Sequence, residues 1–239
     1  AAFVKLLLEA AGQRARAIYV IVTMRSDYLG NCVQFRDLPE RINAGLYLVP
    51  RMRRDQLEDA IAGPVAVEDA AIAPRLLQRL LNETGDDPDQ LPVLQHALLR
   101  AWNAWNHAER PLDTQDLDGI GGMKDGLSRH AEEVFSALSM DQQRIARVIF
   151  QQLSERDAEG REIRRPAPVA EIAAVAGVSE TEVSRVAEAF AGRDASFLYR
   201  NEHAHLDITH ESLIRQWSRM QGARVGTGGE KGWLQEETE

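Results

Sequence analysis

The feature that most constrains the fold is a continuous apolar, β-branched run at residues 17–23, AIYVIVT. Such a run has no polar face, so it suits a strand that is covered on both sides, as in a parallel sheet. It leads into the charged cluster at residues 24–27, at the end of a strand where α/β sheets bind ligands. A second strand candidate, residues 45–49, is closed by Pro50. Residues 1–50 are therefore predicted to form one edge of an α/β sheet.

From residue 51 onward the apolar residues recur at helical spacing. The first of these helices is predicted to end at Pro64, because proline follows a glycine there. Another helix begins next to Pro92, where the missing N–H of proline costs nothing in the first turn. Residues 111–126 are rich in glycine and indicate a loop, so we place a domain boundary near residue 124.

Residues 169–186 carry the pattern of two short helices joined by a tight turn. Gly177 supplies the turn, and Ser179 can cap the second helix. Residues 197–199 and 206–208 flank a polar turn and predict a hairpin. Helices followed by a hairpin predict a winged helix, after which a last amphipathic helix follows. The predicted fold class is therefore α+β, and mainly α.

These patterns divide the chain into four parts. We expect a sheet edge at residues 1–50, a helical domain at 51–123, a winged-helix domain at 124–220 and a flexible tail at 221–239. The tail is expected to be mobile because glycine, lysine and glutamate dominate it. The chain starts without methionine and inside a helical pattern, so we interpret it as a fragment of a longer protein.

The charge disfavours direct DNA binding by the helix-turn-helix. Such a motif can place its second helix in the major groove. The chain has a net charge of −9, and residues 168–192 contain four acids but only one base. DNA affinity depends largely on cations that displace counterions. We therefore expect this motif to serve packing rather than DNA recognition.

The expected cellular location follows from the lack of a membrane-spanning run, a signal peptide and paired cysteines in this sequence. No apolar run approaches the length of a membrane span, and the start lacks the regions of a signal peptide. Cys32 is the only cysteine, so the chain can form neither an internal disulfide nor a cysteine-based zinc site. We expect a cytoplasmic protein in which Cys32 is a small, partly buried apolar residue.

The histidines leave two interpretations open. His203, His205 and His210 lie close together in the sequence, with two acids between and beside them. A metal site is one interpretation, and ordinary polar residues of a surface hairpin are the favoured one. His96 and His130 fall in helical segments, where we expect them to be partly exposed.

Two further motifs are assigned structural roles. Residues 119–124, GIGGMK, are interpreted as a flexible linker and not as a phosphate-binding loop, because no strand precedes them and an acid follows the lysine where serine or threonine is required. Arg161, Arg164 and Arg165 belong to a charged linker, which we expect to be solvated.

Three short stretches, taken in order, resemble the STAND NTPases. Residues 20–29, VIVTMRSDYL, resemble the strand that ends in the sensor arginine of that family. Residues 90–98, QLPVLQHAL, resemble the segment with proline that opens a helix of the helical domain. Residues 208–217, ITHESLIRQW, resemble the His-Glu segment of the winged helix, similar in placement to the Met-His-Asp motif of immune-receptor ATPases. The order and spacing agree with the bacterial group that often precedes WD40 or other repeats.

The resemblance implies a role for one residue in each stretch. Arg25 would sense the γ-phosphate, a task that suits a fixed planar cation. Pro92 and its neighbouring backbone would pack against the adenine. His210 would donate a hydrogen bond to the β-phosphate of ADP and lock the winged helix over the nucleotide. ATP would then favour a different arrangement of the domains.

The resemblance also implies the cofactors and partners. ATP or ADP would be bound with Mg²⁺ held by residues upstream of Ala1, where the family carries its phosphate-binding loop and magnesium-binding acid. The chain alone is thus expected not to hydrolyse ATP, although the full-length protein would be an ATPase. Expected partners are the upstream NTPase core, a downstream repeat domain, and protein partners or further copies of the chain. Residues 222–232 interrupt the helical run that the family usually shows, which leaves the downstream link open.

The resulting functional hypothesis is a nucleotide-dependent signalling switch. Two alternatives remain at this point. One is a transcription regulator that uses the helix-turn-helix, and the other is a non-enzymatic scaffold for protein interactions with a degenerate nucleotide site.

Overall fold

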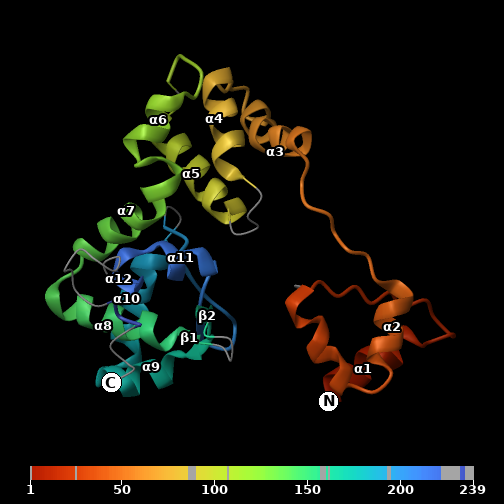
Figure 1. The fold of residues 1–239 in the computed structure, drawn as a ribbon. Coiled ribbons are helices and arrows are strands. Elements are labelled where there is room, and N and C mark those ends of the chain that lie inside the picture. Colours follow the sequence, from red (N-terminus) through yellow and green to blue (C-terminus); the bar gives the residue numbers. More distant parts are fainter. Residues whose placement is uncertain are drawn as a thin grey trace. The chain divides into compact units, whose positions relative to one another are not determined.

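The structure is a computed structural model that divides into two compact units, Ala1–Arg51 and Met52–Glu239. Each is described by itself (Figure 1). The described residues are 2–24, 26–85, 90–106, 108–156, 160, 162–192, 195–221 and 232–234. Within them, every helix is too short or too polar to cross a membrane.

The first unit consists of short helices joined by extended segments. Its elements are α1 (Ala2–Ala11), the 3-10 helix η1 (Ser26–Gln34) and α2 (Leu38–Gly45). Cys32 is buried, as expected from its apolar character, and its Sγ lies 3.7 Å from the sulfur of Met24. The other large apolar side chains of this unit are exposed or only partly buried; the partly buried ones are Val4, Leu7, Leu8, Val20, Leu29, Phe35, Leu38 and Ile42.

The predicted strands at residues 17–23 and 45–49 are not formed. Apart from Gly45, which ends α2, both segments lack regular structure, and most of their side chains face solvent, with Ile21 89% and Tyr47 78% exposed. A strand is stable only when a neighbour pairs with its N–H and C=O groups. The described part of this unit contains no strand that could do so. The β-branched residues favour a strand, but the described part of this unit offers no neighbouring strand to pair with it.

The second unit begins with a helical part, which we define as α3–α6. Its helices and the following α7 are α3 (Arg54–Val67), α4 (Pro74–Thr84), α5 (Gln90–Trp105), α6 (Thr114–Gly119) and α7 (Gly122–Ser136). Helix α3 continues through Pro64 to Val67, so the predicted end at Pro64 is wrong. Leu57, Ile61 and Val65 are buried on one face of α3. Their packing offsets the backbone hydrogen bond that a proline inside a helix removes.

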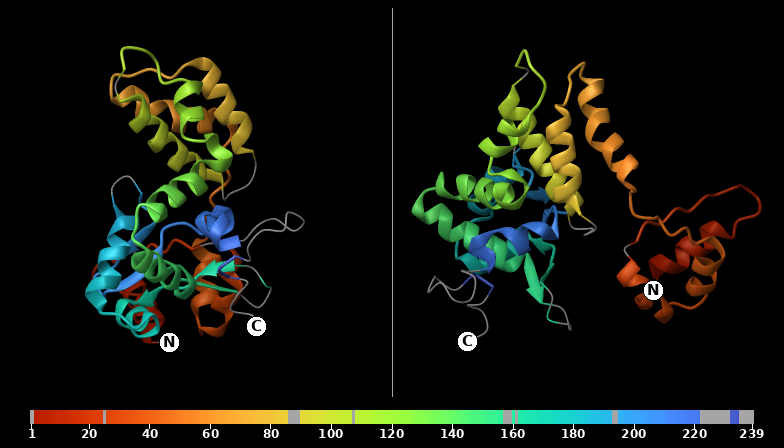
Figure 2. Two further views of the ribbon diagram at one scale, coloured as in Figure 1. Left: turned by 90° about the vertical axis from the view of Figure 1, so that its left-hand side faces the viewer. Right: turned by 45° about the horizontal axis from the view of Figure 1, so that its top comes forward.

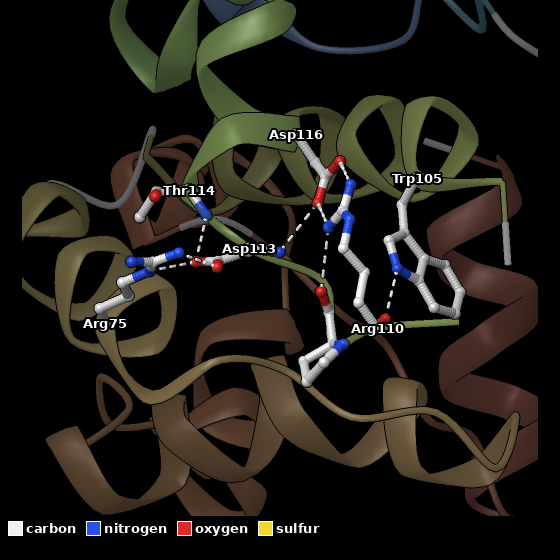
Figure 3. Close-up of polar contacts among 7 residues, drawn as sticks. Arg75, Trp105, Arg110, Asp113, Thr114 and Asp116 are labelled. Carbon is white, nitrogen blue, oxygen red and sulfur yellow. Dashed lines mark hydrogen bonds and ion pairs between the residues drawn. The ribbon is translucent and has the colours of Figure 1, made fainter. Parts of the chain in front are cut away.

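Helix α6 occupies part of the segment that was predicted to be a loop, and side chains explain why. Asp113 caps it by accepting a hydrogen bond from the N–H of Thr114 at 2.7 Å. Asp116 is buried, accepts two hydrogen bonds from Arg110 at 2.6 and 2.7 Å, and has its pKa lowered chiefly by that guanidinium. Trp105 donates to the carbonyl of Arg110 at 2.8 Å (Figure 3). A charged pair thus anchors a six-residue helix that is too short to be stable alone.

The rest of the second unit is a bundle of short helices and two small sheets, which we call the C-terminal bundle. Its elements are α8 (Met140–Gln152), β1 (Ser154–Arg156), β2 (Glu162–Arg164), β3 (Ala167–Pro168), α9 (Val169–Ala176), α10 (Glu180–Ala191), β4 (Leu198–Arg200), β5 (His205–Ile208), α11 (Glu211–Gln216) and α12 (Ser218–Gln221). Strands β1 and β2 form one antiparallel pair, and β3, β5 and β4 form an antiparallel sheet in that order.

The helix-turn-helix and the hairpin are confirmed. Gly177 ends α9 in the left-handed conformation at φ 68°, which favours glycine. Ser179 caps α10 and forms the reciprocal pair with Glu182. Strands β4 and β5 pair around the predicted polar turn, with Tyr199 opposite Asp207. The mainly helical α+β fold class is likewise confirmed.

An aromatic core holds the C-terminal bundle together. Phe150, Phe190 and Trp217 are fully buried, with the Phe150 ring centroid 5.0 Å from Phe190 and 4.9 Å from Trp217. Trp233 joins this core with its ring 5.1 Å from Trp217. The expectation of a mobile tail thus fails for Trp233 and Leu234, since both are buried in the bundle core. Residues 222–231 and 235–239 of that tail lie outside the described residues.

Helix α7 takes part in both hydrophobic cores of the second unit. Met123 belongs to the core of the helical part, whereas Leu127, Ala131 and Phe135 belong to the core of the C-terminal bundle. Figure 2 shows this helix running from one group of elements to the other. One helix therefore fixes how α5 and α11 are placed relative to each other.

Replacing Phe150 with alanine tests the aromatic core. Phe150→Ala is expected to lower the free energy of unfolding by about 3–5 kcal/mol, because it leaves a cavity among close-packed rings. Urea denaturation followed by circular dichroism measures the loss. Met140→Ala, in the same helix but at a residue that is 76% exposed, should change stability by less than about 0.5 kcal/mol. Equal effects of the two substitutions would contradict the described core.

Candidate functional site

The structure brings two of the three predicted site residues onto neighbouring helices. Pro92 lies in the first turn of α5, where it is partly buried. His210 is the N-cap residue of α11, and α11 packs against α5. The side chain of His210 makes no capping hydrogen bond, and the residue is exposed. Arg25 lies outside the described residues, so its role stays a prediction.

A pair of histidines lies between α5 and α7. His96 follows Pro92 by one helical turn, and its Nε2 lies 3.4 Å from Nδ1 of His130. The ring of Phe197 packs against both, at centroid distances of 5.4 Å from His96 and 5.0 Å from His130. His130 is only 5% exposed, so the expectation of a partly exposed helix residue is wrong for it. Its burial comes from residues that are distant in the sequence.

His96 is held in its neutral form. Burial is the main cause, and the nearby His130, Arg100 and His210 add to it, so that the pKa of His96 falls from 6.5 to about 4. A neutral imidazole has one donor and one acceptor nitrogen, which suits a hydrogen bond between two such rings. The effect of His210 on His96 also places these two side chains within electrostatic reach of each other.

Arg100 adds a cation to the same junction. It pairs with Glu133 of α7 at 2.8 Å, so the ion pair fastens α5 to α7. Its Nε is buried and has no hydrogen-bond partner among the residues that the structure describes. The position of His96 could have been anticipated, because residues four apart share one face of a helix. His130 and Phe197 gave no such local signal.

Arg164 of the C-terminal bundle influences the titration of His210. The pKa of the histidine is lowered, first because protein atoms partly desolvate the ring and second because the cation of Arg164 lies nearby. Arg164 and Arg165 are ion-paired with Asp207 and Glu171, at 3.2 and 2.6 Å. The expectation of a solvated charged linker is therefore wrong for these two arginines, and Arg161 lies outside the described residues.

A polar cleft of about 950 Å³ opens beside the first residue of α5. Its charged and amide lining residues are Arg79, Glu83, Gln90, Lys124, Asp125, Arg215, Gln216 and Gln221. Arg79 is already ion-paired with Glu83 and Asp118, at 2.7 and 2.6 Å. Gly121 and Gly122 of the glycine-rich segment also line this cleft and lead into α7. Gly122 is the first residue of α7, so the prediction of a flexible linker is wrong for residues 122–124.

The metal interpretation of the hairpin histidines finds no support. His205 Nδ1 lies 3.0 Å from the backbone oxygen of His203, a contact within the turn. Among the described residues, no three histidine, cysteine, aspartate or glutamate side chains lie close enough together to hold a metal ion.

The fold and the site define a mainly helical α+β module with histidines at the junction between its helical part and its C-terminal bundle. The chain belongs to the novel STAND NTPase 1 family, whose family model matches residues 1–228. No curated protein and no solved structure matches it. The resemblance that the three sequence stretches indicated is thereby confirmed. Family membership makes this a STAND NTPase-type signalling protein and implies nucleotide binding in general terms.

The neutral His96 predicts a loss of stability in acid. In the unfolded chain this residue takes up a proton near pH 6.5, but in the folded chain only near pH 4. Its contribution is therefore fully present above pH 6.5, declines as the pH falls through this window and is lost below pH 4, by about 3 kcal/mol in total. Urea unfolding at pH 7 and pH 5 measures the decline.

His96→Leu should flatten that pH dependence, because it removes the group that titrates. His203→Leu, at an exposed position in the hairpin turn, should keep the dependence of the unmodified chain. A pH dependence that is unchanged in His96→Leu would show that other groups cause the acid sensitivity.

Proposed function

We propose that this chain is the nucleotide-responsive lid of an ATP/ADP-dependent signalling switch. In this proposal the nucleotide is held mainly by residues that precede the chain, together with Mg²⁺. The helical part and the C-terminal bundle, as a winged-helix domain, close over it. ADP holds the closed arrangement, and ATP favours another one.

The observation that carries the proposal is the packing of α11 against α5. Pro92 lies in the first turn of α5, and His210 is the N-cap residue of α11. Both residues belong to the segments that resemble nucleotide-contacting motifs, and they are 118 positions apart in the sequence. Membership of the novel STAND NTPase 1 family supports the same assignment. A ligand that touches both helices would stabilise their contact.

The state of His210 suits a phosphate contact. Its residue is exposed, its side chain does not cap its own helix, and its lowered pKa favours the neutral ring at pH 7. A neutral imidazole can donate one hydrogen bond to a phosphate oxygen without adding a permanent charge. Pro92 offers an apolar surface in the first turn of α5, as packing against a base requires.

The switch must obey the arithmetic of a two-state equilibrium. A nucleotide shifts the equilibrium only by the ratio of its affinities for the two arrangements. Moving the population from mostly closed to mostly open needs about 5 kcal/mol of differential binding. One hydrogen bond to a charged group supplies about 1.5–3 kcal/mol of this. His210 would therefore be one contributor, with the γ-phosphate sensor proposed at Arg25 as another.

The DNA-binding alternative is less well supported. The first turn of α10 carries Glu180 and Glu182, so the helix that would enter the groove begins with two acids. Arg164 and Arg165, the nearby cations, are engaged in ion pairs. A scaffold without nucleotide remains the other alternative, and the experiment below separates it from the switch.

Nucleotide content tests the proposal directly. The full-length protein that contains this chain is purified and denatured, and released nucleotide is identified by chromatography. We expect stoichiometric ADP. His210→Ala should weaken ADP affinity by about tenfold to a hundredfold, which corresponds to the loss of one charge-assisted hydrogen bond. Titration calorimetry with Mg²⁺ and ADP measures the change.

His203→Ala is the matched control, because it removes an exposed imidazole from the turn of the same bundle. It should leave ADP affinity unchanged. Folded protein that carries no nucleotide and binds no added ADP would favour the scaffold. Binding to duplex DNA at moderate salt would favour the transcription regulator.

A further inference from the structure

We propose that Arg164 is a positioning residue for His210, so that the β1–β2 hairpin controls the contact assigned to that histidine. The positioning of His210 by Arg164 involves only residues of this chain. Its consequence for ADP rests on the function proposed above.

Arg164 forms hydrogen bonds with the two residues at the end of β5, shortly before His210. Its Nη1 donates to the backbone carbonyl of Ile208 at 2.9 Å and to Oδ2 of Asp207 at 3.2 Å. Ile208 ends β5 and lies two residues before His210. The guanidinium therefore ties β2 to the end of the strand that leads into the histidine.

The same side chain also reaches the residue just after His210. Nε of Arg164 lies 3.9 Å from Oε1 of Glu211, the first residue of α11. Glu211 in turn pairs with Arg215 one turn later, at 3.1 Å. His210 thus lies between two points that Arg164 holds. A planar guanidinium can serve several acceptors in fixed directions, which the single ammonium of lysine cannot reproduce.

The acid that receives Arg164 is itself firmly placed. Asp207 is only 6% exposed, and its Oδ2 also accepts the hydroxyl hydrogen bond of Tyr199 at 3.0 Å. This contact raises the pKa of Tyr199. A buried carboxylate without its cation is strongly destabilised, so the pair resists separation. Arg164 therefore has one well-defined place rather than several.

Several charged or titratable groups lie on the elements around His210. Arg164 of β2 and His96 of α5 interact with it electrostatically, while Asp207 of β5 and Glu211 of α11 flank it in the chain and pair with Arg164. Arg215 of α11 pairs with Glu211, and Arg100 of α5 pairs with Glu133. Of these, Arg164 acts on the histidine as a like charge and lowers its pKa, second to partial desolvation. Arg164 thus affects both where the ring lies and how readily it takes a proton.

The position of Arg164 links His210 to the hairpin. Arg164 is the last residue of β2 and is paired across the strands with Ser154 of β1. A partner that displaced this hairpin from α11 would withdraw the guanidinium from both of its anchor points. The backbone around His210 would then no longer be held in one conformation, and the pKa of its ring would rise. The position of the β1–β2 pair would in this way control the proposed contact between His210 and phosphate.

An NMR titration of the histidine rings of this chain tests the inference without any nucleotide. The His210 signal is assigned by its loss in His210→Gln. Arg164→Gln should raise the pKa of His210 toward its ordinary value, because the nearby cation is removed. Arg164→Lys should restore the low pKa, because the charge returns, but should not restore the chemical shift of the fixed ring, because the hydrogen-bonding fork is missing.

Arg165→Gln is the matched control. It removes the same charge one residue further along, from a side chain that bonds Gln152 and Glu171 instead. It should leave the His210 signal and its pKa unchanged. A His210 pKa in folded Arg164→Gln that equals that of the unmodified chain would overturn the inference. So would an equal shift in Arg165→Gln.

The consequence for nucleotide is measured separately, in the full-length protein with Mg²⁺ and ADP at pH 8. There His210 is neutral in every variant, so only its placement differs. Arg164→Gln and Arg164→Lys should both weaken ADP binding by about three- to tenfold, and Arg165→Gln should not. If the full-length protein binds no ADP but the titration behaves as expected, the proposed function fails while the positioning role stands. If ADP binds and Arg164→Gln leaves both readouts unchanged, the positioning role fails alone.

Discussion

The relation between the helical part and the C-terminal bundle depends on one helix, α7. Met123 in its first turn is buried in the core of the helical part, and Phe135 near its end is buried in the bundle core. Arg219 of α12 pairs with Glu132 at 2.6 Å, which fastens the last helix to the same rod. A helix of this length moves as one body, so a shift or rotation of α7 changes the packing in both cores. The contact between α5 and α11 therefore depends on packing along α7, and not on their own few shared residues alone.

The features that the sequence predicted correctly are those that a few consecutive residues determine. The capping residue Ser179 and the turn residue Gly177 act within one turn of their own position, and each is found as expected. The hairpin and the mainly helical class follow from equally local patterns. Pro92 and His210 could be singled out through resemblance, but the packing of their helices, α5 and α11, is a tertiary contact that no local pattern contains.

The predictions that failed depended on neighbours that are distant in the sequence. Residues 17–23 have the composition of a strand, yet pairing groups on another segment decide whether a strand forms. Pro64 should end a helix, but the buried face of α3 carries it onward. Trp233 follows a polar, glycine-rich stretch, and an aromatic slot beside Trp217 buries it. His130 is likewise buried by α5 and Phe197. For Pro64, Trp233 and His130, packing against residues that are distant in the sequence outweighed a local preference, and burial of apolar surface contributes about 25 cal/mol per Å² to such packing.

The polar junction between the two cores follows a different logic from the cores themselves. Apolar packing there would bind α5 to the C-terminal bundle without any dependence on ligand or proton. The junction instead carries His96 in neutral form, with His210 exposed at its edge. Neutral imidazole rings can lie close together at little energetic cost. A bound proton or phosphate changes the charge at the junction and therefore the energy of the contact. Such a contact is stable enough to define one arrangement and can be biased by a modest interaction energy. This is the physical property that a two-state signalling element needs.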